Sequence, residues 1–319
     1  MADPIVPLFS LVSGEGAGAL LGVAAGDVAG GNSPVGYSAL TQQATVVSYH
    51  LLLRDGVFGP DLATEWAELG ADGSNPSVYR GASAEFEAWL AHVNSPEQVR
   101  VRRPDCEPAV RALPVGIWFR RDPASLVTAA LEVSRLTHMD AATAIAAAAA
   151  SGAAAACAFG QSGRDLLAAV NEVVAIAAIR VAEETEGFID GAAATAFVEA
   201  ARAMKANGAV EASEVGSPGP QWIIAAIRLA ADVNVEPGES VGRAAHLGGS
   251  QLGALVGGLL GARIGFRNWP WNVPNTSWFA EVGLRLVSGS REIRDLPVPY
   301  YVEESLTHGI DRDHQQPFR

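Results

Sequence analysis

The stretch Gly16-Ala17-Gly18-Ala19-Leu20-Leu21-Gly22, continued by Gly26-Asp27-Val28-Ala29-Gly30, decides the fold of this chain. Glycine and alanine at helical spacing allow the backbones of two helices to approach closely. Small residues crowd two further segments in the same way, over 141–159 and 252–265. We therefore expect helices packed in layers within one compact bundle.

Helix-forming residues dominate the rest of the chain. Alanine and other strong helix formers recur at helical spacing almost everywhere, and Asp122-Pro123 and Asp61 are typical helix starts. Val, Ile and Tyr do not collect into alternating runs bounded by hairpin turns, so we expect no sheet. The predicted fold class is all-α, with helices over residues 16–29, 40–54, 62–69, 83–92, 109–119, 123–136, 141–159, 164–182, 191–206, 221–229, 239–247 and 253–264.

The organisation along the chain indicates one main domain. The 319 residues allow a substantial core, and the breaks over 208–220 and at Pro237-Gly238 have the length of loops. We expect a single helical domain over residues 1–296. The segment 297–319, which carries prolines and tyrosines before a polar end, is expected to form an extended C-terminal arm.

Composition excludes several classes of partner. Hydrophobic residues make up 49% and charged residues 18%, as in a globular chain, and the net charge is −13. A field of that sign repels phosphate backbones, so nucleic acid is not an expected partner. The basic stretch Arg100-Val101-Arg102-Arg103 is either a solvated turn or a local clamp for a ligand phosphate.

The expected compartment is the cytoplasm. Cys106 and Cys157 are too few for a disulfide framework, and no basic segment precedes an apolar core at the N-terminus. The apolar run 141–159 approaches membrane-spanning length, but it is mostly alanine and contains Thr143 and Ser151. We interpret it as a buried helix and expect no membrane association. The sequence makes no prediction about the oligomeric state.

Several separated motifs resemble one family. Besides the glycine-rich opening, they are Tyr79-Arg80-Gly81-Ala82-Ser83, Ala109-Val110-Arg111-Ala112-Leu113-Pro114-Val115-Gly116, Leu136-Thr137-His138 and His246-Leu247-Gly248-Gly249-Ser250-Gln251-Leu252-Gly253. In order and spacing they resemble the bacterial ADP-ribosylglycohydrolases over roughly residues 14 to 266. The resemblance implies a compact orthogonal multi-helix bundle of the ADP-ribosylglycohydrolase type.

The resemblance also implies a metal site that this chain lacks. The family typically carries Thr-Asp-Asp-Thr-Gln, where this sequence reads Ser38-Ala39-Leu40-Thr41-Gln42. The second family motif, Asp-x-Asp-Thr, aligns its acids either with Ser250 and Leu252 or with Gly248 and Ser250. Neither alignment offers a carboxylate, and magnesium needs anionic oxygen ligands. We expect no metal ligands and no cofactor.

Three titratable residues are the candidate catalytic groups: Asp27, Glu107 and His246. Asp27 is either an acid, base or ribose ligand, or a buried carboxylate that organises the backbone at its helix end. Glu107 is either a replacement carboxylate for the site or an exposed loop acid. His246 precedes the altered glycine loop, where an imidazole would shuttle protons near neutral pH.

Other polar and basic side chains form the candidate ligand-binding set, which comprises Ser38, Thr41, Gln42, Arg111, His138, Ser250 and Gln251. Ser250 and Gln251 put neutral hydrogen-bonding groups where the family has acids, and so would bind sugar hydroxyls without a cation. Thr41 alternatively caps its helix, and Arg111 alternatively forms an internal pair with Glu107. His138 alternatively interacts favourably with a helix dipole.

These observations leave three functional hypotheses. The first is a repurposed, metal-independent enzyme, a hydrolase or lyase acting on a nucleotide-derived or glycosylated small molecule. The alternative is a catalytically inactive pseudoenzyme that binds ADP-ribose or a related ligand as a sensor or partner module. The third is a conventional magnesium hydrolase whose ligands lie elsewhere in the sequence. Each takes a small molecule as its partner.

Overall fold

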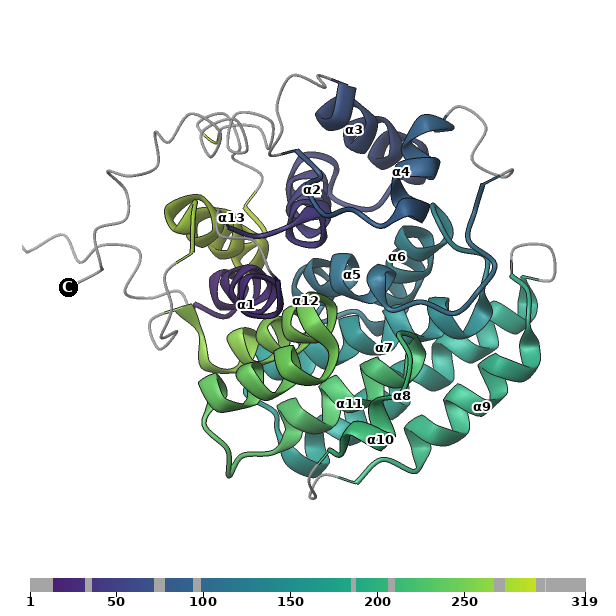
Figure 1. Cartoon of the computed structure of the whole chain (residues 1–319), viewed down its shortest axis with the longest axis vertical. Helices are drawn as coiled ribbons and strands as arrows, with labels where there is room; N and C mark the ends of the chain where they lie inside the picture. The colour runs from purple at the N-terminus through teal and green to yellow at the C-terminus, as the bar shows by residue number, and fades with distance from the viewer. Residues whose placement is uncertain are drawn as a thin grey trace, which may run out of the picture.

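The structure is a computed structural model that describes residues 14–31, 36–71, 78–93, 99–184, 188–205, 210–266, 273–290 and Leu296. Within these residues it contains thirteen helices and no sheet, which confirms the predicted all-α class. Short bridges join Val101 to His138 and Asp140 to Ile189. The helices, shown in Figure 1, are α1 (Glu15–Gly30), α2 (Ala39–Arg54), α3 (Gly59–Ala71), α4 (Ala84–Ala91), α5 (Glu107–Trp118), α6 (Pro123–Arg135), α7 (Ala141–Ala158), α8 (Gly163–Glu183), α9 (Gly191–Arg202), α10 (Ala212–Val215), α11 (Pro220–Ala231), α12 (Pro237–Ile264) and α13 (Thr276–Ser288).

Glycines bring α1 and α12 into backbone contact. They are spaced every four residues on both helices and meet in antiparallel order, in the pairs Gly18–Gly261, Gly22–Gly257, Gly26–Gly253 and Gly30–Gly249. A Cβ atom at Gly26 would lie 1.9 Å from the carbonyl oxygen of Gly253. Since backbone on both sides leaves no room for a side chain, the close packing predicted for the opening glycines is present.

The alanine-rich helix α7 lies in the interior. Every residue of α7 is buried, and Ser151 donates to the carbonyl oxygen of Ala112 on α5 at 2.8 Å. A Cβ at Gly116 of α5 would lie 2.0 Å from the carbonyl oxygen of Ser151. Of the described helices, α7 alone has the length and hydropathy of a membrane span, and its residues are buried inside the fold. This is the packing expected of a core helix.

A kink divides α12 next to the site. Gly248 (φ −143°, ψ 20°) and Gly249 (φ 60°, ψ −152°) are not helical, and the positive φ of Gly249 favours glycine. The two helices predicted over 239–247 and 253–264 are therefore two arms of one bent element. The glycines of α12 that meet α1 lie at the kink and in the second arm, from Gly249 to Gly261.

Two helices were not predicted from the sequence, the short α10 and the longer α13. Helix α13 packs on α1 through small residues, because a Cβ at Gly16 would lie 2.1 Å from the carbonyl oxygen of Gly283. That contact depends on the tertiary arrangement and leaves no local signal. The predicted arm over 297–319 lies outside the described residues.

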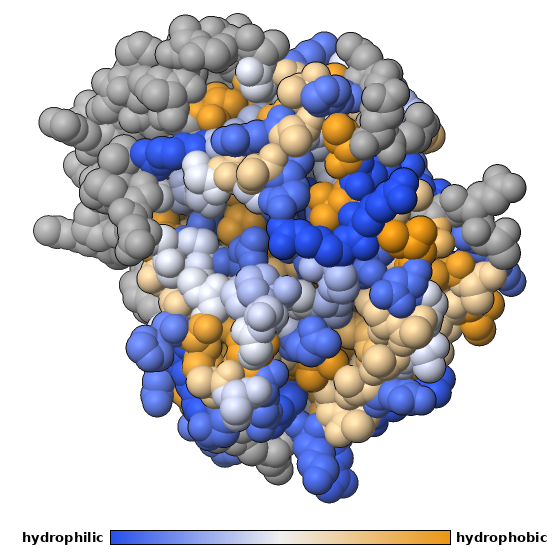
Figure 2. All heavy atoms as spheres, turned by 45° about the vertical axis from the view of Figure 1, so that its right-hand side comes forward, coloured by the Kyte–Doolittle hydropathy of each residue, from blue (hydrophilic) through white to orange (hydrophobic). Residues whose placement is uncertain are grey.

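The described surface mixes polar and apolar side chains. On the face shown in Figure 2, hydrophilic and hydrophobic residues are interspersed. The large apolar side chains that remain exposed in the described part of the chain are Leu53, Phe58, Phe159, Ile179 and Val233. Isolated exposed apolar residues are normal on a folded chain.

Candidate functional site

A pocket of about 670 Å³ lies between the start of α2 and the kink of α12. The start of α5 and the loop before α4 complete its wall. It brings together both segments in which the sequence lacks the family's acids. Its described lining residues are Gly31, Ser38, Ala39, Leu40, Gln43, Arg80, Gly81, Ala82, Ser83, Glu107, Gly248, Ser250 and Gln251.

The geometry of the kink distinguishes the two alignments of the second motif. Gly248 and Ser250 line the pocket, whereas Leu252 is fully buried in the hydrophobic core. On the opposite wall, Ala39 and Leu40 also line the pocket. This placement favours the alignment that puts Gly248 and Ser250 at the family's acidic positions.

Asp27 joins the end of α1 to the start of α2. Its carboxylate accepts hydrogen bonds from the backbone N–H of Ser38 at 2.8 Å, from the Ser38 hydroxyl at 2.9 Å and from the Thr41 hydroxyl at 2.8 Å. Asp27 is only 1% exposed and does not line the pocket. Burial raises its pKa, while the bonds from Ser38 and Thr41 oppose that rise. The geometry matches the interpretation of Asp27 as a carboxylate that organises adjacent backbone.

The residue that caps α2 is Ser38, and not Thr41 as one interpretation of the sequence predicted. Ser38 is the N-cap, and its Oγ accepts from the N–H of Leu40 at 3.3 Å. Gln42 is buried, and its Oε1 accepts from the backbone N–H of Tyr79. Of Ser38, Thr41 and Gln42, only Ser38 lines the pocket.

Ser250 and Gln251, two predicted ligand-binding residues, lie on the pocket wall, and contact with a ligand stays a prediction. The Ser250 hydroxyl donates to the backbone carbonyl of Asp27 at 3.0 Å, which ties the kink of α12 to the end of α1. The Oε1 atom of Gln251 accepts from the Sγ of Cys106 at 3.0 Å. Burial raises the pKa of the Cys106 thiol well above its usual value, so this sulfur stays a protonated donor.

Glu107 is the one carboxylate among the described lining residues, and all its polar contacts are internal. Its Oε1 accepts from Nε2 of Gln43 at 2.8 Å, and its Oε2 accepts from the Ser83 hydroxyl at 2.8 Å. The guanidinium of Arg111, one helical turn later, lies 3.6 Å from Oε1. The interpretation of Glu107 as an exposed loop acid is wrong, because it begins α5 and is 2% exposed.

Arg111 is held away from the pocket by a network of buried groups. It donates to Oε1 of Gln43 at 2.7 Å and to the hydroxyl of Thr137, and its guanidinium lies 5.1 Å from the centre of the Trp66 ring. Burial lowers its pKa to about 10, against the opposing charges of Glu107 and Asp105, so it stays cationic at neutral pH. This is the internal pair with Glu107 that the sequence allowed.

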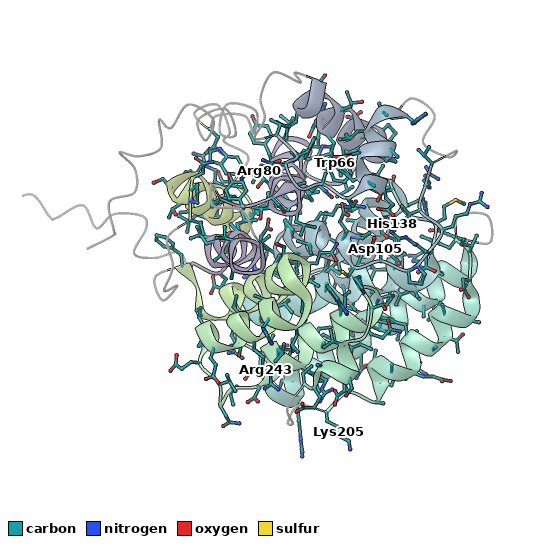
Figure 3. The ribbon with its side chains drawn as sticks, in the orientation of Figure 1. Trp66, Arg80, Asp105, His138, Lys205 and Arg243 are labelled. Atoms are coloured by element: carbon teal, nitrogen blue, oxygen red, sulfur yellow. The ribbon has the colours of Figure 1, made fainter. Side chains whose placement is uncertain are left out.

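The same network continues through His138. Thr137 Oγ1 lies 2.7 Å from His138 Nδ1, and His138 Nε2 lies 3.6 Å from a carboxylate oxygen of Asp105. Figure 3 shows His138 and Asp105 close together. Burial raises the pKa of Asp105, but the nearby imidazole of His138 and the backbone N–H groups of Cys106 and Glu107 lower it below its usual value overall.

The two candidate histidines both lie away from the pocket lining. His138 is 2% exposed and lines no part of the described pocket wall. His246 is exposed on the first arm of α12, before the kink. The roles predicted for His138 in ligand binding and for His246 in catalysis stay predictions. Because neither side chain lines the pocket, each would influence a ligand there only through the residues between them.

Three lining residues with polar side chains are outside the predicted set: Gln43, Arg80 and Ser83. Arg80 and Ser83 belong to the Tyr79–Ser83 motif, which carried the family resemblance and was the signal available for them. Gln43 follows the predicted Gln42 directly. Because successive helical residues point in different directions, a shift of one residue changes which glutamine faces the pocket.

The donor groups of the pocket do not fit a pair of magnesium ions. The positions that the resemblance aligns with the family's acids are Ala39, Leu40, Gly248 and Ser250 in the favoured alignment, and they carry no carboxylate. Glu107 is balanced by Arg111. A hard divalent cation requires several anionic oxygens. The described residues also contain no group of three or more His, Cys, Asp or Glu side chains that would hold a metal.

Two comparisons with known proteins agree on the fold. A family model described as ADP-ribosylglycohydrolase matches residues 15–296. A solved structure described as an ADP-ribosylglycohydrolase-related protein complex is similar with a TM-score of 0.64 and 18% identity, covering 87% of this chain and 98% of the other. At that identity the likeness shows the fold alone. No curated protein matches the sequence.

Proposed function

This chain belongs to the ADP-ribosylglycohydrolase family, and from that premise we propose that its pocket binds ADP-ribose or a related nucleotide-derived molecule without magnesium and without cleaving it. One observation carries the proposal: the carboxylate of Glu107 on the pocket wall is already bonded to Gln43 and Ser83 and paired with Arg111. The pocket thus offers hydrogen-bonding groups but no free acid or base among its described residues.

The distribution of carboxylates argues against glycosidic cleavage by an ordinary route. That reaction uses two carboxyl groups placed on either side of the scissile bond. The second candidate, Asp27, directs its oxygens at Ser38 and Thr41 and lies outside the lining. The residues therefore support a binding protein better than a metal-independent hydrolase or lyase.

Thermal unfolding with and without metal tests this proposal. A ligand that binds only the folded state raises Tm by mass action. We expect ADP-ribose to raise the Tm of the whole chain equally in EDTA and in millimolar magnesium, with no product detected by chromatography. Multiple turnover of ADP-ribose, or stabilisation only when magnesium is added, would overturn the proposal.

A pair of matched variants tests whether ADP-ribose binds in this pocket. Ala82→Trp puts a large ring on the pocket wall, whereas Ala192→Trp puts the same ring on the exposed face of α9. We expect the first variant to lose the stabilisation by ADP-ribose and the second to keep it. Loss in both variants, or in neither, would contradict the pocket as the binding site.

The enzyme hypothesis keeps one supporting observation, since Glu107 does lie on the pocket wall. A ligand that displaced Gln43 or Ser83 would free this carboxylate for acid–base chemistry. The probe is NAD, whose nicotinamide–ribose bond is N-glycosidic. Release of nicotinamide by the wild type, abolished in Glu107→Gln and kept in Asp27→Asn, would make the enzyme the better assignment.

A further inference from the structure

Arg80 is the one cationic side chain among the described residues of the pocket lining. It is partly buried, and no carboxylate in the described part of the chain forms an ion pair or hydrogen bond with its guanidinium. Figure 3 places Arg80 apart from Asp105 and His138, which belong to the network around Arg111. In a chain of net charge −13, a guanidinium that lines a pocket without an acidic partner is available to an incoming anion.

The described lining of the pocket has one positive charge, on Arg80, that no described acid neutralises. Glu107 is the acid of the described lining, and the guanidinium of Arg111 lies 3.6 Å from it. The remaining polar lining residues are the neutral Ser38, Gln43, Ser83, Ser250 and Gln251. With Glu107 balanced by Arg111, the charge of Arg80 is the one left for a ligand.

The loop that carries Arg80 is held in an unusual backbone conformation. Tyr79, directly before it, has a φ of 51°. The other described non-glycine residues with positive φ are Asp55, Asp190 and Asn275, whose side chains tolerate this region, whereas a bulky tyrosine does so at a cost in free energy. Such strain persists where surrounding contacts enforce it, and it concentrates at ligand sites.

Contacts of Tyr79 and of the Arg80 backbone enforce this conformation. The backbone N–H of Tyr79 donates to Gln42 Oε1, and the Tyr79 hydroxyl donates to the carbonyl oxygen of Trp66 at 2.8 Å. The carbonyl oxygen of Arg80 itself accepts from the N–H of Ala39 at 3.0 Å. The loop is therefore fixed to the first turn of α2, and its position does not depend on the Arg80 side chain.

We propose that Arg80 is the anion-recognition residue of this pocket and that the ligand class is a sugar carrying a phosphate or carboxylate group. The anion pairs with the guanidinium, whose planar fork matches either group in a bidentate manner. The sugar hydroxyls face the neutral groups of Ser250 and Gln251. The inference rests on the proposed metal-free binding. It adds that the pocket recognises the anionic group of the ligand through Arg80.

Calorimetric titration of the full chain in EDTA tests the assignment. The probes are ribose 5-phosphate, ribonate, unsubstituted ribose and ADP-ribose, so that phosphate, carboxylate and neutral forms of one sugar are compared. In the wild type we expect at least one of the two charged sugars to bind more tightly than ribose. Arg80→Gln should weaken binding of that sugar and of ADP-ribose by about tenfold or more, since a charge-assisted hydrogen bond is lost.

A matched variant and a folding control accompany the test. Arg164→Gln removes an arginine exposed on α8, outside the pocket lining, and should leave every affinity unchanged. Arg80→Lys keeps the charge without the fork and should retain part of the affinity. Because Arg80 is partly exposed and its backbone makes the loop contacts, Arg80→Gln should keep the far-ultraviolet dichroism and Tm of the wild type.

The outcomes separate the two proposals. Wild-type binding that Arg80→Gln leaves unchanged would overturn the role of Arg80 while leaving metal-free binding in place. Tighter binding of ribose than of both charged sugars would overturn the ligand class. Failure of ADP-ribose and of every sugar to bind the wild type at millimolar concentration would overturn the proposed function, and this inference with it.

Discussion

Two buried regions meet at the pocket and are built in opposite ways. The contact between α1 and α12 consists of backbone against backbone, with glycines such as Gly22 and Gly257 facing one another. The region around α2, α5 and α6 is instead filled by charged and polar side chains, with Arg111 between Glu107 and Thr137. Asp27 follows the glycine Gly26 and holds the start of α2, so it connects the two regions.

The difference indicates that the two regions respond to substitution for different physical reasons, one steric and the other electrostatic. The glycine contact has no side chain to replace, so any larger residue must move a helix. The polar region depends on each partner being present, because a buried group without its partner loses hydrogen bonding that water would otherwise supply. Steric and electrostatic changes should therefore fail by different mechanisms.

The largest effect is expected for Gly26→Ala in the glycine contact. The new Cβ would lie 1.9 Å from the carbonyl oxygen of Gly253, and backbone cannot move aside as a flexible side chain can. We expect a loss well beyond the roughly 1–3 kcal/mol typical of overpacked cores and larger than that of any other variant below, with failure to fold if stability is marginal. Denaturant unfolding followed by circular dichroism measures it.

Gly242→Ala is the control within the same helix. Gly242 is exposed on the first arm of α12, and a Cβ there would meet nothing within 4 Å. We expect this variant to gain about 0.5–1 kcal/mol, since alanine favours helix over the unfolded chain. Similar stabilities for Gly26→Ala and Gly242→Ala would refute the backbone contact.

An intermediate effect is expected for Arg111→Met in the polar region. The change leaves Glu107 buried without its cation, which costs about 3–5 kcal/mol when one partner of a buried ion pair is removed. Adding Glu107→Gln should restore part of the loss, so that the two changes together cost less than their sum. Urea unfolding of the four members of this cycle gives the coupling energy.

The exposed pair of Arg54 and Asp61 supplies the comparison for that cycle. Their charged atoms lie 3.4 Å apart, with side chains 46% and 49% exposed. Arg54→Met should change the unfolding free energy by less than about 1 kcal/mol. A cost as large as that of Arg111→Met would show that burial does not set the difference.

The smallest effect is a pH dependence at Asp27, where the two regions join. Burial raises its folded-state pKa above the usual value of 3.8. The folded state therefore holds a proton that the unfolded chain has already lost, and the contribution of Asp27 to stability falls as pH rises through that window. Asp27→Asn removes this titration.

Unfolding free energies at a series of pH values above 3.8 provide the measurement. We expect the stability of the wild type relative to Asp27→Asn to decrease as pH rises, then to level off once the folded carboxyl is ionised. A relative stability that increases over this range would mean that the bonds from Ser38 and Thr41 outweigh burial.

Much of the fold was predictable from the sequence because its main contact leaves a local pattern. Glycines four residues apart, such as Gly18 and Gly22, mark a helix face without side chains. Helix α13 was missed since its contact at Gly283 becomes meaningful only when Gly16 is placed beside it. The bend of α12 depends on the positive φ of Gly249, and the presence of a glycine in the sequence does not by itself predict that conformation.

The site was predictable in outline and not in detail. The two pocket walls, near Leu40 and Ser250, follow from the motifs that carry the family resemblance. The partners of Glu107 do not, because Gln43 lies 64 positions away and its amide could point to many groups. Long-range hydrogen bonds have no periodic signature in a sequence, so which polar groups are internally bonded and which face the pocket required the structure.

The alanine composition of α7 has a consequence for how the interior is stabilised. Alanine has no side-chain rotamers to lose, so burying this helix costs little conformational entropy beyond that of its backbone. Each alanine also adds little apolar area, so the helix contributes through low ordering cost more than through the size of its side chains. The centre of this protein is therefore ordered at little cost in side-chain entropy, and any rotamer change on ligand binding falls to the longer side chains that surround the pocket.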